Sequence, residues 1–413
     1  MGFKSEDWIY DWNKPPDGEG SLLAKPIQLN DETMRDGLQS PSAKIPSIEA
    51  KIELLHILSD LGVFSLDIGF PASSEKAFAD TELLAREIVE KKLSLKANCA
   101  ARTLVSDIRP VIEISQRAGM PLEVAAFLGS SLARMYAEEW DEAFLLKSVE
   151  TSVKEAVRAG LSIMFVTEDT TRTQPELLRK LYTVAIECGA GRICAADTVG
   201  FATPAGTFRL VSFLREVVEA TGEEIAIDWH GHMDRGLGLG CTLAALEGGA
   251  DRLHGSALGI GERVGNTPLE LIIVNLKLMG LWERDIGLLE RYVEWVPRYT
   301  GIPIPRNHPV FGRDAYRTGT GVHAAAIAKA IKKGDGRLAD LIYSSVPASW
   351  CGKSQTIEIG PMSGDANIVS WLIAHGRHVT MEKVKLLRNL AKKANGVLSE
   401  EEILNALNDM EGP

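Results

Sequence analysis

Eight short runs of apolar and β-branched residues recur along the chain, and each is followed by a longer segment with apolar residues at helical spacing. The runs are 26–31, 63–70, 93–99, 121–127, 161–167, 192–198, 224–230 and 251–257. Segments 48–62 and 81–92 are typical of the amphipathic helices between them. Strands that alternate with helices form parallel βα units. Eight such units predict an α/β chain folded as a (β/α)8 TIM barrel, with a doubly wound parallel sheet as the alternative.

Polar and charged residues gather at the carboxyl ends of these runs. They include Arg35, Asp36, Asp67, Arg102, Ser130, Ser131, Glu168, Asp169, Asp197, Thr198, His230, His232 and the loop 259–266. In a TIM barrel these ends form one rim, where active sites lie. Because every run contributes to the rim, the pattern favours the barrel and predicts a functional site at its mouth.

The same rhythm divides the chain into three parts. Residues 1–24 form a Pro- and Gly-rich N-terminal arm, 25–280 the catalytic barrel, and 281–413 a linker with helical subdomains. Three aromatic residues stand in the arm: Trp8, Tyr10 and Trp12. The arm is either a frayed terminus or a segment that docks these rings on a partner subunit. With the helical extension it offers apolar surface that a lone barrel does not need, so we predict a homodimer.

Charge and cysteine content restrict the partners and the compartment. The net charge of −11 argues against a nucleic-acid partner. No apolar run approaches the roughly 18 residues that span a bilayer, and no secretory signal is visible in residues 1–20, so we expect no membrane partner. Five cysteines without a CxxC pair are typical of reduced thiols. We therefore expect a cytoplasmic protein.

The pair His230-x-His232 is the sharpest chemical signal. Residues i and i+2 of a strand point to the same face, so both imidazoles are expected to face the barrel interior. Two convergent histidines suit a divalent metal ion, although a hydrogen-bonded structural pair is the alternative. Asp36, Glu168 and Asn266 can converge on them from other strand ends. Oxygen and nitrogen ligands without thiolate suit Mg, Mn, Zn or Co.

Two neighbouring segments supply groups around such an ion. Arg35 and Asp36 are either a surface pair or divide their roles, Asp36 as a ligand and Arg35 neutralising a developing oxyanion. The Gly-rich loop 259–266 is either a tight turn or brings the Asn266 amide oxygen to the ion. Within that loop, Glu262 and Arg263 are expected to form a buried pair.

The other histidines divide into one candidate and a structural group. His323 follows GTGV outside the barrel, at the start of a predicted helix. The remaining ones are assigned to structural roles: His56, His254, His308, His375 and His378.

Several segments together carry a family resemblance. They are LNDETMRDGLQS (29–40), LDIGFP (66–71), FVTEDTTR (165–172), AADTVG (195–200), HGHMDRGLG (230–238), GIGERVGNTPLE (259–270), GTGVH (319–323) and SGDAN (363–367). Over roughly 25–370 the chain resembles the metal-dependent Claisen-condensing acyltransferases on a TIM barrel. This group holds 2-isopropylmalate, homocitrate, citramalate and Re-type citrate synthases, and its superfamily includes 3-hydroxy-3-methylglutaryl-CoA lyase.

The resemblance implies a role for each matching residue. The metal ligands would be Asp36, His230, His232 and Asn266. Catalytic roles fall to Arg35, Glu168, His323 and Tyr343, with His323 as the acid/base from the C-terminal extension of its own or a partner subunit. Substrate-binding roles fall to Arg35, Gln39, Asp67, Arg102 and Thr198. Two positions depart from the family pattern, Met233 where Asn is common and Asp67 where Glu is usual, and both leave the substrate open.

The implied reaction condenses acetyl-CoA with a 2-oxo acid and then hydrolyses the thioester. LDIGFP resembles the 2-isopropylmalate synthase version of its strand, whereas the length of 413 residues resembles homocitrate synthase. Re-citrate and citramalate synthase remain alternatives. A 3-hydroxy-3-methylglutaryl-CoA lyase is more distant, because its Gly-rich loop would be expected to carry a cysteine that GIGERVGN lacks. Intact Arg35, Glu168 and His323 argue against a non-catalytic regulator.

Overall fold

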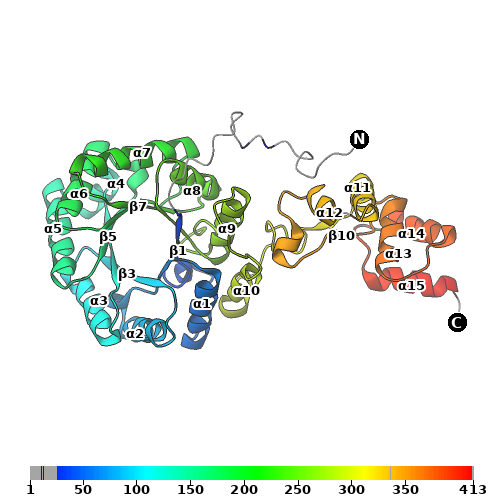
Figure 1. Ribbon diagram of the computed structural model, residues 1–413, viewed down its shortest axis with the longest axis horizontal. Coiled ribbons are helices and arrows are strands. Elements are labelled where there is room, and N and C mark those ends of the chain that lie inside the picture. The colour runs from blue at the N-terminus through cyan, green and yellow to red at the C-terminus, as the bar shows by residue number, and fades with distance from the viewer. Residues whose placement is uncertain (1–10, 12, 14–25, 335, 412–413) are drawn as a thin grey trace. The chain divides into compact units, whose positions relative to one another are not determined.

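Eight parallel strands close into a barrel in the computed structural model, which describes residues 11, 13, 26–334 and 336–411 (Figure 1). The strands are β1 Gln28–Asp31, β2 Ser65–Asp67, β3 Lys96–Arg102, β4 Glu123–Gly129, β5 Ile163–Glu168, β6 Arg192–Asp197, β7 Ala226–Gly231 and β8 Arg252–Gly255. Each pairs in parallel with the next, and β8 closes on β1. The predicted TIM barrel is confirmed, and the doubly wound alternative is wrong because the sheet has no open edge.

Helices surround the strands on the outside of the barrel (Figure 1). They are α1 Ile48–Leu61, α2 Glu75–Glu90, α3 Val105–Ala118, α4 Leu132–Glu138, α5 Glu142–Arg158, α6 Pro175–Glu187, α7 Pro204–Thr221, α8 Gly238–Glu247, α9 Leu269–Leu278 and α10 Leu289–Thr300. Among the described residues, none of the helices combines the length and the apolarity that a membrane crossing needs.

Local sequence explains where these helices begin and end, as α1 shows. Its N-cap Ser47 accepts a hydrogen bond from the Ala50 amide. Gly62 ends the helix at a φ of +77°, a left-handed conformation that side chains disfavour. Between these signals, Leu54 and Leu58 are fully buried. Capping fixes the length of the helix, and the apolar stripe fixes which face it turns inward.

Two compact units make up the chain, and α10 belongs to the barrel unit, 20–303. The indole of Trp295 in α10 donates to the Ala50 carbonyl at 2.8 Å, and the Tyr292 hydroxyl donates to Asp31 Oδ2 at 2.5 Å. The barrel unit therefore extends past the expected boundary at residue 280 and includes α10.

The second unit, which includes 304–413, has its own core. It contains helices α11 Gly321–Lys332, α12 Gly336–Leu341, α13 Asp365–Ala374, α14 Met381–Lys393 and α15 Glu400–Glu411, and the parallel pair β9 Arg317–Thr318 and β10 Thr356–Ile357. Trp371, Leu387 and Leu407 are buried together in one apolar cluster. The predicted C-terminal helical extension is thus confirmed.

The aromatic residues of the arm, Trp8, Tyr10 and Trp12, lie outside the described residues, and the homodimer stays a prediction. We expect light scattering to give a dimeric mass at micromolar protein. A triple alanine variant of these residues should shift the mass toward the monomer, because burial of each aromatic side chain at an interface contributes about 1.5–3 kcal/mol. The exposed aromatic Tyr136 supplies a control, Tyr136→Ala, which should stay dimeric. A fully active monomer would contradict the prediction.

Candidate active site and metal centre

A cavity of about 250 Å³ opens at the carboxyl ends of the strands. The predicted site residues that line it are Arg35, Asp36, Gln39, Asp67, Glu168, Thr198, His230 and His232. They come from β1, β2, β5, β6 and β7 or from the loops that follow these strands. The structure therefore brings most of the predicted rim residues to one cavity.

Asp36, His230 and His232 present three ligand atoms to one point. The Nε2 atoms of the two histidines are 3.2 Å apart, and Asp36 Oδ2 lies 3.3 Å from Nε2 of His230 and 3.5 Å from Nε2 of His232. Ligands at about 2.1 Å from one divalent ion stand about 3.0–3.4 Å apart in octahedral or tetrahedral geometry. All three side chains are buried, so the spacing fits a bound ion.

The protonation states suit the same purpose. Burial and the neighbouring His230 lower the pKa of His232 to about 4, so its imidazole is neutral and offers a lone pair. Burial opposes ionisation of Asp36, but the Arg35 charge and His230 outweigh it and hold the pKa of Asp36 well below its usual range. The cluster thus offers a carboxylate and a neutral imidazole, which are the forms that bind metal.

Asn266 is the fourth predicted ligand, and it lies beside Asp36. A Cβ added to Gly261 would overlap Asn266 Nδ2 and lie 3.1 Å from Asp36 Oδ1, so only glycine lets this loop pass between them. Asn266 is fully buried, and its Nδ2 donates to the Ile260 carbonyl at 3.1 Å. Its Oδ1 finds no hydrogen-bond partner among the described residues. An orphaned buried acceptor of this kind fits a ligand awaiting a cation.

Arg35 is held by carboxylates on two of its nitrogens. Its Nε lies 3.0 Å from Asp67 Oδ2, and its Nη2 lies 2.5 Å from Glu32 Oε2. The third nitrogen, Nη1, is 3.4 Å from Asp36 Oδ2 at the metal cluster. Nη1 therefore faces the Asp36–His230–His232 cluster, where it can meet an oxygen that develops negative charge.

Two carboxyl groups of the cavity have perturbed acidities. Burial raises the pKa of Asp67 to about 7, and the negative charge of Glu32 acts in the same direction. Arg35 opposes both effects. Burial also raises the pKa of Glu168, although Arg134 and Arg35 oppose it. On the next strand end, Thr198 accepts from the Asp169 amide at 2.8 Å. Acidities shifted by burial and a charge partner are common where carboxyl groups take part in proton transfer.

Two predicted contacts differ in the structure. Arg102 does not line the cavity; Asp107 in the first turn of α3 captures its guanidinium at 2.7 Å and 3.0 Å. Arg263 pairs with Asp234 at 2.9 Å rather than with Glu262, whose amide donates to Asp36 at 3.1 Å. The expected Glu262–Arg263 pair is therefore wrong, and the substrate-binding role of Arg102 stays a prediction without a place in this cavity.

His323 and Tyr343 come together within the C-terminal unit. Their rings stack with centroids 4.1 Å apart and an interplanar angle of 28°. His323 is the third residue of α11, and its side chain is exposed. The two residues to which the resemblance gives catalytic roles are thus in contact, and those roles remain a proposal.

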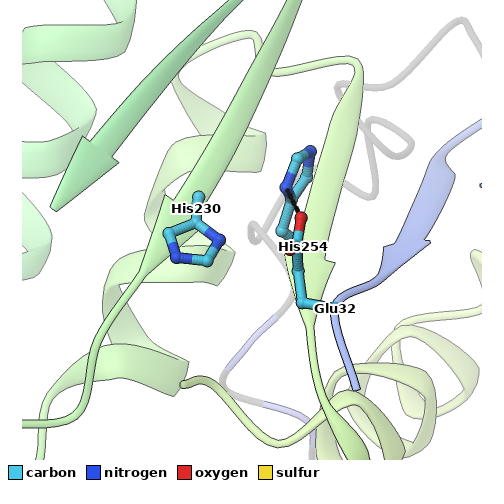
Figure 2. Close-up of side chains that lie close together, drawn as sticks. All are labelled: Glu32, His230 and His254. Atoms are coloured by element: carbon cyan, nitrogen blue, oxygen red, sulfur yellow. Dashed lines mark hydrogen bonds and ion pairs between the residues drawn. The ribbon is translucent and has the colours of Figure 1, made fainter. Parts of the chain in front are cut away.

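Glu32 and His254 line the cavity, although the sequence reasoning gave neither of them a role in the site. Figure 2 shows Glu32, after β1, bonded to His254 on β8, with His230 on β7 opposite them. The signal available in the sequence was the position of His254 inside the predicted strand run 251–257, but a single strand histidine does not reveal its partner.

Comparison with known proteins agrees with this geometry. The HMGL-like family model matches residues 26–291. A homocitrate synthase of Methanopyrus kandleri is 32% identical over 85% of this chain and 83% of its own length. A 2-isopropylmalate synthase of Saccharolobus solfataricus is 29% identical over 93% of this chain and 96% of its own.

One solved structure supports the fold alone. It is the HMG-CoA lyase of Brucella melitensis, with a TM-score of 0.54 and 20% identity, covering 67% of this chain and 99% of that one. The barrel, the residues at its mouth and these matches lead to one assignment: the chain belongs to the HMGL-like family and, within it, to the 2-isopropylmalate synthase and homocitrate synthase group.

Proposed function

We propose that the protein is an acyltransferase that condenses acetyl-CoA with a 2-oxo acid and then hydrolyses the thioester. The observation that carries this proposal is the convergence of Asp36, His230 and His232 within 3.5 Å, with Arg35 Nη1 beside them. Relatives named homocitrate synthase and 2-isopropylmalate synthase support the same reaction class.

We propose a divalent ion, Mg, Mn, Zn or Co, held by Asp36, His230, His232 and Asn266. When bound, such an ion polarises the keto group of the 2-oxo acid as a Lewis acid. The protein groups around it have separate tasks. Arg35 stabilises the oxyanion through Nη1, Glu168 and Thr198 orient the 2-oxo acid, and Gln39 lies within reach of the same cavity.

Proton transfer falls to the C-terminal unit in this proposal. His323 is the candidate base that removes a methyl proton from acetyl-CoA. Tyr343, stacked on it at 4.1 Å, orients the ring.

The apolar wall of the cavity favours a 2-oxo acid with an alkyl side chain. The residues of this wall are Phe70, Ala100, Ala125, Phe127, Met164, Val166 and Ala196. Phe70 and Phe127 meet edge to face with centroids 5.9 Å apart. Of the arginines that line the described cavity, Arg35 faces three carboxylates and Arg263 pairs with Asp234. A second carboxylate on the substrate would therefore find no spare arginine on this wall.

A 2-isopropylmalate synthase activity fits that wall best, ahead of homocitrate, Re-citrate and citramalate synthase and of a lyase. A thiol-release assay with acetyl-CoA and a divalent ion tests this across 2-oxoisovalerate, pyruvate, oxaloacetate and 2-oxoglutarate. We expect the highest kcat/KM with 2-oxoisovalerate. Pyruvate, which lacks the two branch methyl groups, should be lower by about tenfold, since each buried methylene contributes about 0.8 kcal/mol. The His230→Ala protein, purified in parallel, measures background release.

Other outcomes of the same panel point to the alternatives. A preference for either dicarboxylic 2-oxo acid would contradict the alkyl substrate. Cleavage of 3-hydroxy-3-methylglutaryl-CoA without any condensation would replace the synthase by the lyase.

The raised pKa of Asp67 gives a prediction on pH dependence. Ionised Asp67 accepts from Arg35 Nε, whereas protonated Asp67 loses the charge assistance, so kcat should rise with pH through about 7. Asp67→Asn should remove this limb and leave a lower, flatter profile. Asp80, which pairs with Lys51 outside the catalytic cavity, gives the control Asp80→Asn, and that variant should keep the limb. A limb that survives in Asp67→Asn would assign it to another group.

A further inference from the structure

A chain of buried charges runs from the catalytic cavity into the barrel interior, and the proposed chemistry does not use its central member, His254. The Nδ1 atom of His254 lies 2.8 Å from Glu32 Oε1, and its Nε2 lies 2.8 Å from Asp228 Oδ2. Both His254 and Glu32 are 2% exposed, and Asp228 is fully buried. Figure 2 shows the first of these contacts at the cavity.

This geometry makes His254 a cation. Ionised carboxylates only accept hydrogen bonds, so an imidazole between two of them must donate from both nitrogens. Burial alone lowers the pKa of His254, but the hydrogen bonds to Asp228 and Glu32 outweigh it and raise that pKa. Against the cost of burial, Arg35 and His254 lower the pKa of Glu32 to about 2.

The same contacts exclude a second metal site at Glu32, His230 and His254, whose ligand atoms lie within 4.8 Å of one another. Glu32 Oε1 accepts from His254 and from Asn30 Nδ2 at 2.8 Å, and Oε2 accepts from Arg35. Both nitrogens of His254 are also engaged. A cation here would have to displace bonds that already satisfy every one of these atoms.

Positive and negative charges alternate along this series of buried ion pairs. Arg35 contacts Glu32, Glu32 contacts His254, and His254 contacts Asp228. Below these, Asp228 contacts Arg252 at 2.5 Å and Arg192 at 2.7 Å. Without the His254 cation, the carboxylates of Glu32 and Asp228 would lose the charge between them, and buried carboxylates without a partner rearrange or take up protons. Either change would alter the carboxylate that holds Arg35 Nη2.

We propose that His254 is a positioning residue, which holds the Glu32 carboxylate against Arg35 and thereby aims Arg35 Nη1 at the reacting oxygen. The inference rests on the proposed condensation. It predicts that His254 acts on the rate of the chemical step through Arg35, and not on binding of the metal ion or of the 2-oxo acid.

Kinetics on four variants test this: His254→Ala, Glu32→Gln, Arg35→Lys and the double variant His254→Ala/Arg35→Lys. We expect His254→Ala to lower kcat by roughly 10–100-fold, with KM for the 2-oxo acid and the calorimetric Kd for Mn²⁺ changed less than about threefold. The double variant should be no slower than Arg35→Lys alone, because both substitutions remove the same function, the placement of Arg35 Nη1. Losses that multiply, or a kcat within twofold of wild type, would overturn the inference.

Controls separate positioning from stability. Arg192→Gln breaks the lower end of the same network, at Asp228 and Gln28, and should lower the melting temperature while keeping kcat. His254→Gln keeps a donor and should recover part of the rate. If circular dichroism shows that His254→Ala does not fold, Glu32→Gln and its double variant with Arg35→Lys carry the same expectation, since Gln keeps the shape of Glu.

Wild-type turnover in the same assay separates the inference from the proposed function. If wild type is active and His254→Ala turns over at the same rate, the positioning role is overturned and the proposed function stands. If wild type releases no CoA, the proposed function fails, and crystal structures of both proteins decide the inference. Arg35 Nη2 should then leave Glu32 in His254→Ala, and an unmoved Arg35 would refute the role.

Discussion

Alanine in place of His230 or His232 should reduce turnover by roughly 10³-fold or more while the barrel stays folded, because a divalent ion in such a site supplies several kcal/mol of transition-state stabilisation. Each substitution removes one corner of a triangle with sides of 3.2, 3.3 and 3.5 Å. The melting temperature of the metal-free variants should stay close to that of metal-free wild type. Inductively coupled plasma spectrometry should show that the bound ion is lost.

The chain offers a matched control for this experiment. His378 is exposed in the C-terminal unit, so His378→Ala makes the same change away from the cluster and should keep both ion and rate. Chelation of wild type should imitate the His230 variant, and added Mn²⁺ should restore wild type alone. Full activity of His230→Ala after chelation would show that the cluster is not the metal site.

The second large effect is expected for His323, whose replacement by alanine should lower condensation by about 10²- to 10⁴-fold, as for a general acid–base group. Binding of the 2-oxo acid should persist, because none of the residues assigned to it lies in the C-terminal unit. Calorimetry measures that binding, and thiol release measures the rate. Tyr343→Phe keeps the ring that stacks on His323 at 4.1 Å and should lose far less.

His375 provides the control for a ring-stacked histidine. It stacks on Trp371 at 3.8 Å in the same unit, so His375→Ala tests whether loss of a stacked imidazole alone affects turnover. Its rate should equal that of wild type. An unchanged kcat in His323→Ala would refute the acid–base role.

The barrel and its rim could be predicted from sequence because both follow from local pattern. Strand runs alternate with helices, and the polar residues stand where the runs end; parallel strands in a closed barrel then bring those ends to one side. Asp36 and His230 needed no further information to be placed together. Boundaries were less certain, since the run 63–70 contains only the short strand β2, Ser65–Asp67. Pairing with neighbouring strands, rather than apolar character, decides where a strand ends.

Side-chain direction at the rim could not be predicted. Arg102 ends β3 just as Asp67 ends β2, yet Asp107 turns it away from the cavity. Arg263 likewise forms an ion pair with Asp234, not with its neighbour Glu262. A charged side chain pairs with an oppositely charged group close to it in the fold, and sequence order does not tell which group that is.

By itself, the sequence determined the order of the βα units, the rim and the types of candidate metal ligand, because these depend on periodicity and on chemistry within a few residues. Only the tertiary structure decided which charged groups His254 contacts. Closure of the barrel sets β8 beside β1 with His254 opposite Asn30, and so joins His254 to Glu32 across 222 positions of the chain. Such a bond exists only once the sheet has closed, because hydrogen bonding between strands fixes their register and the register selects which buried charges meet.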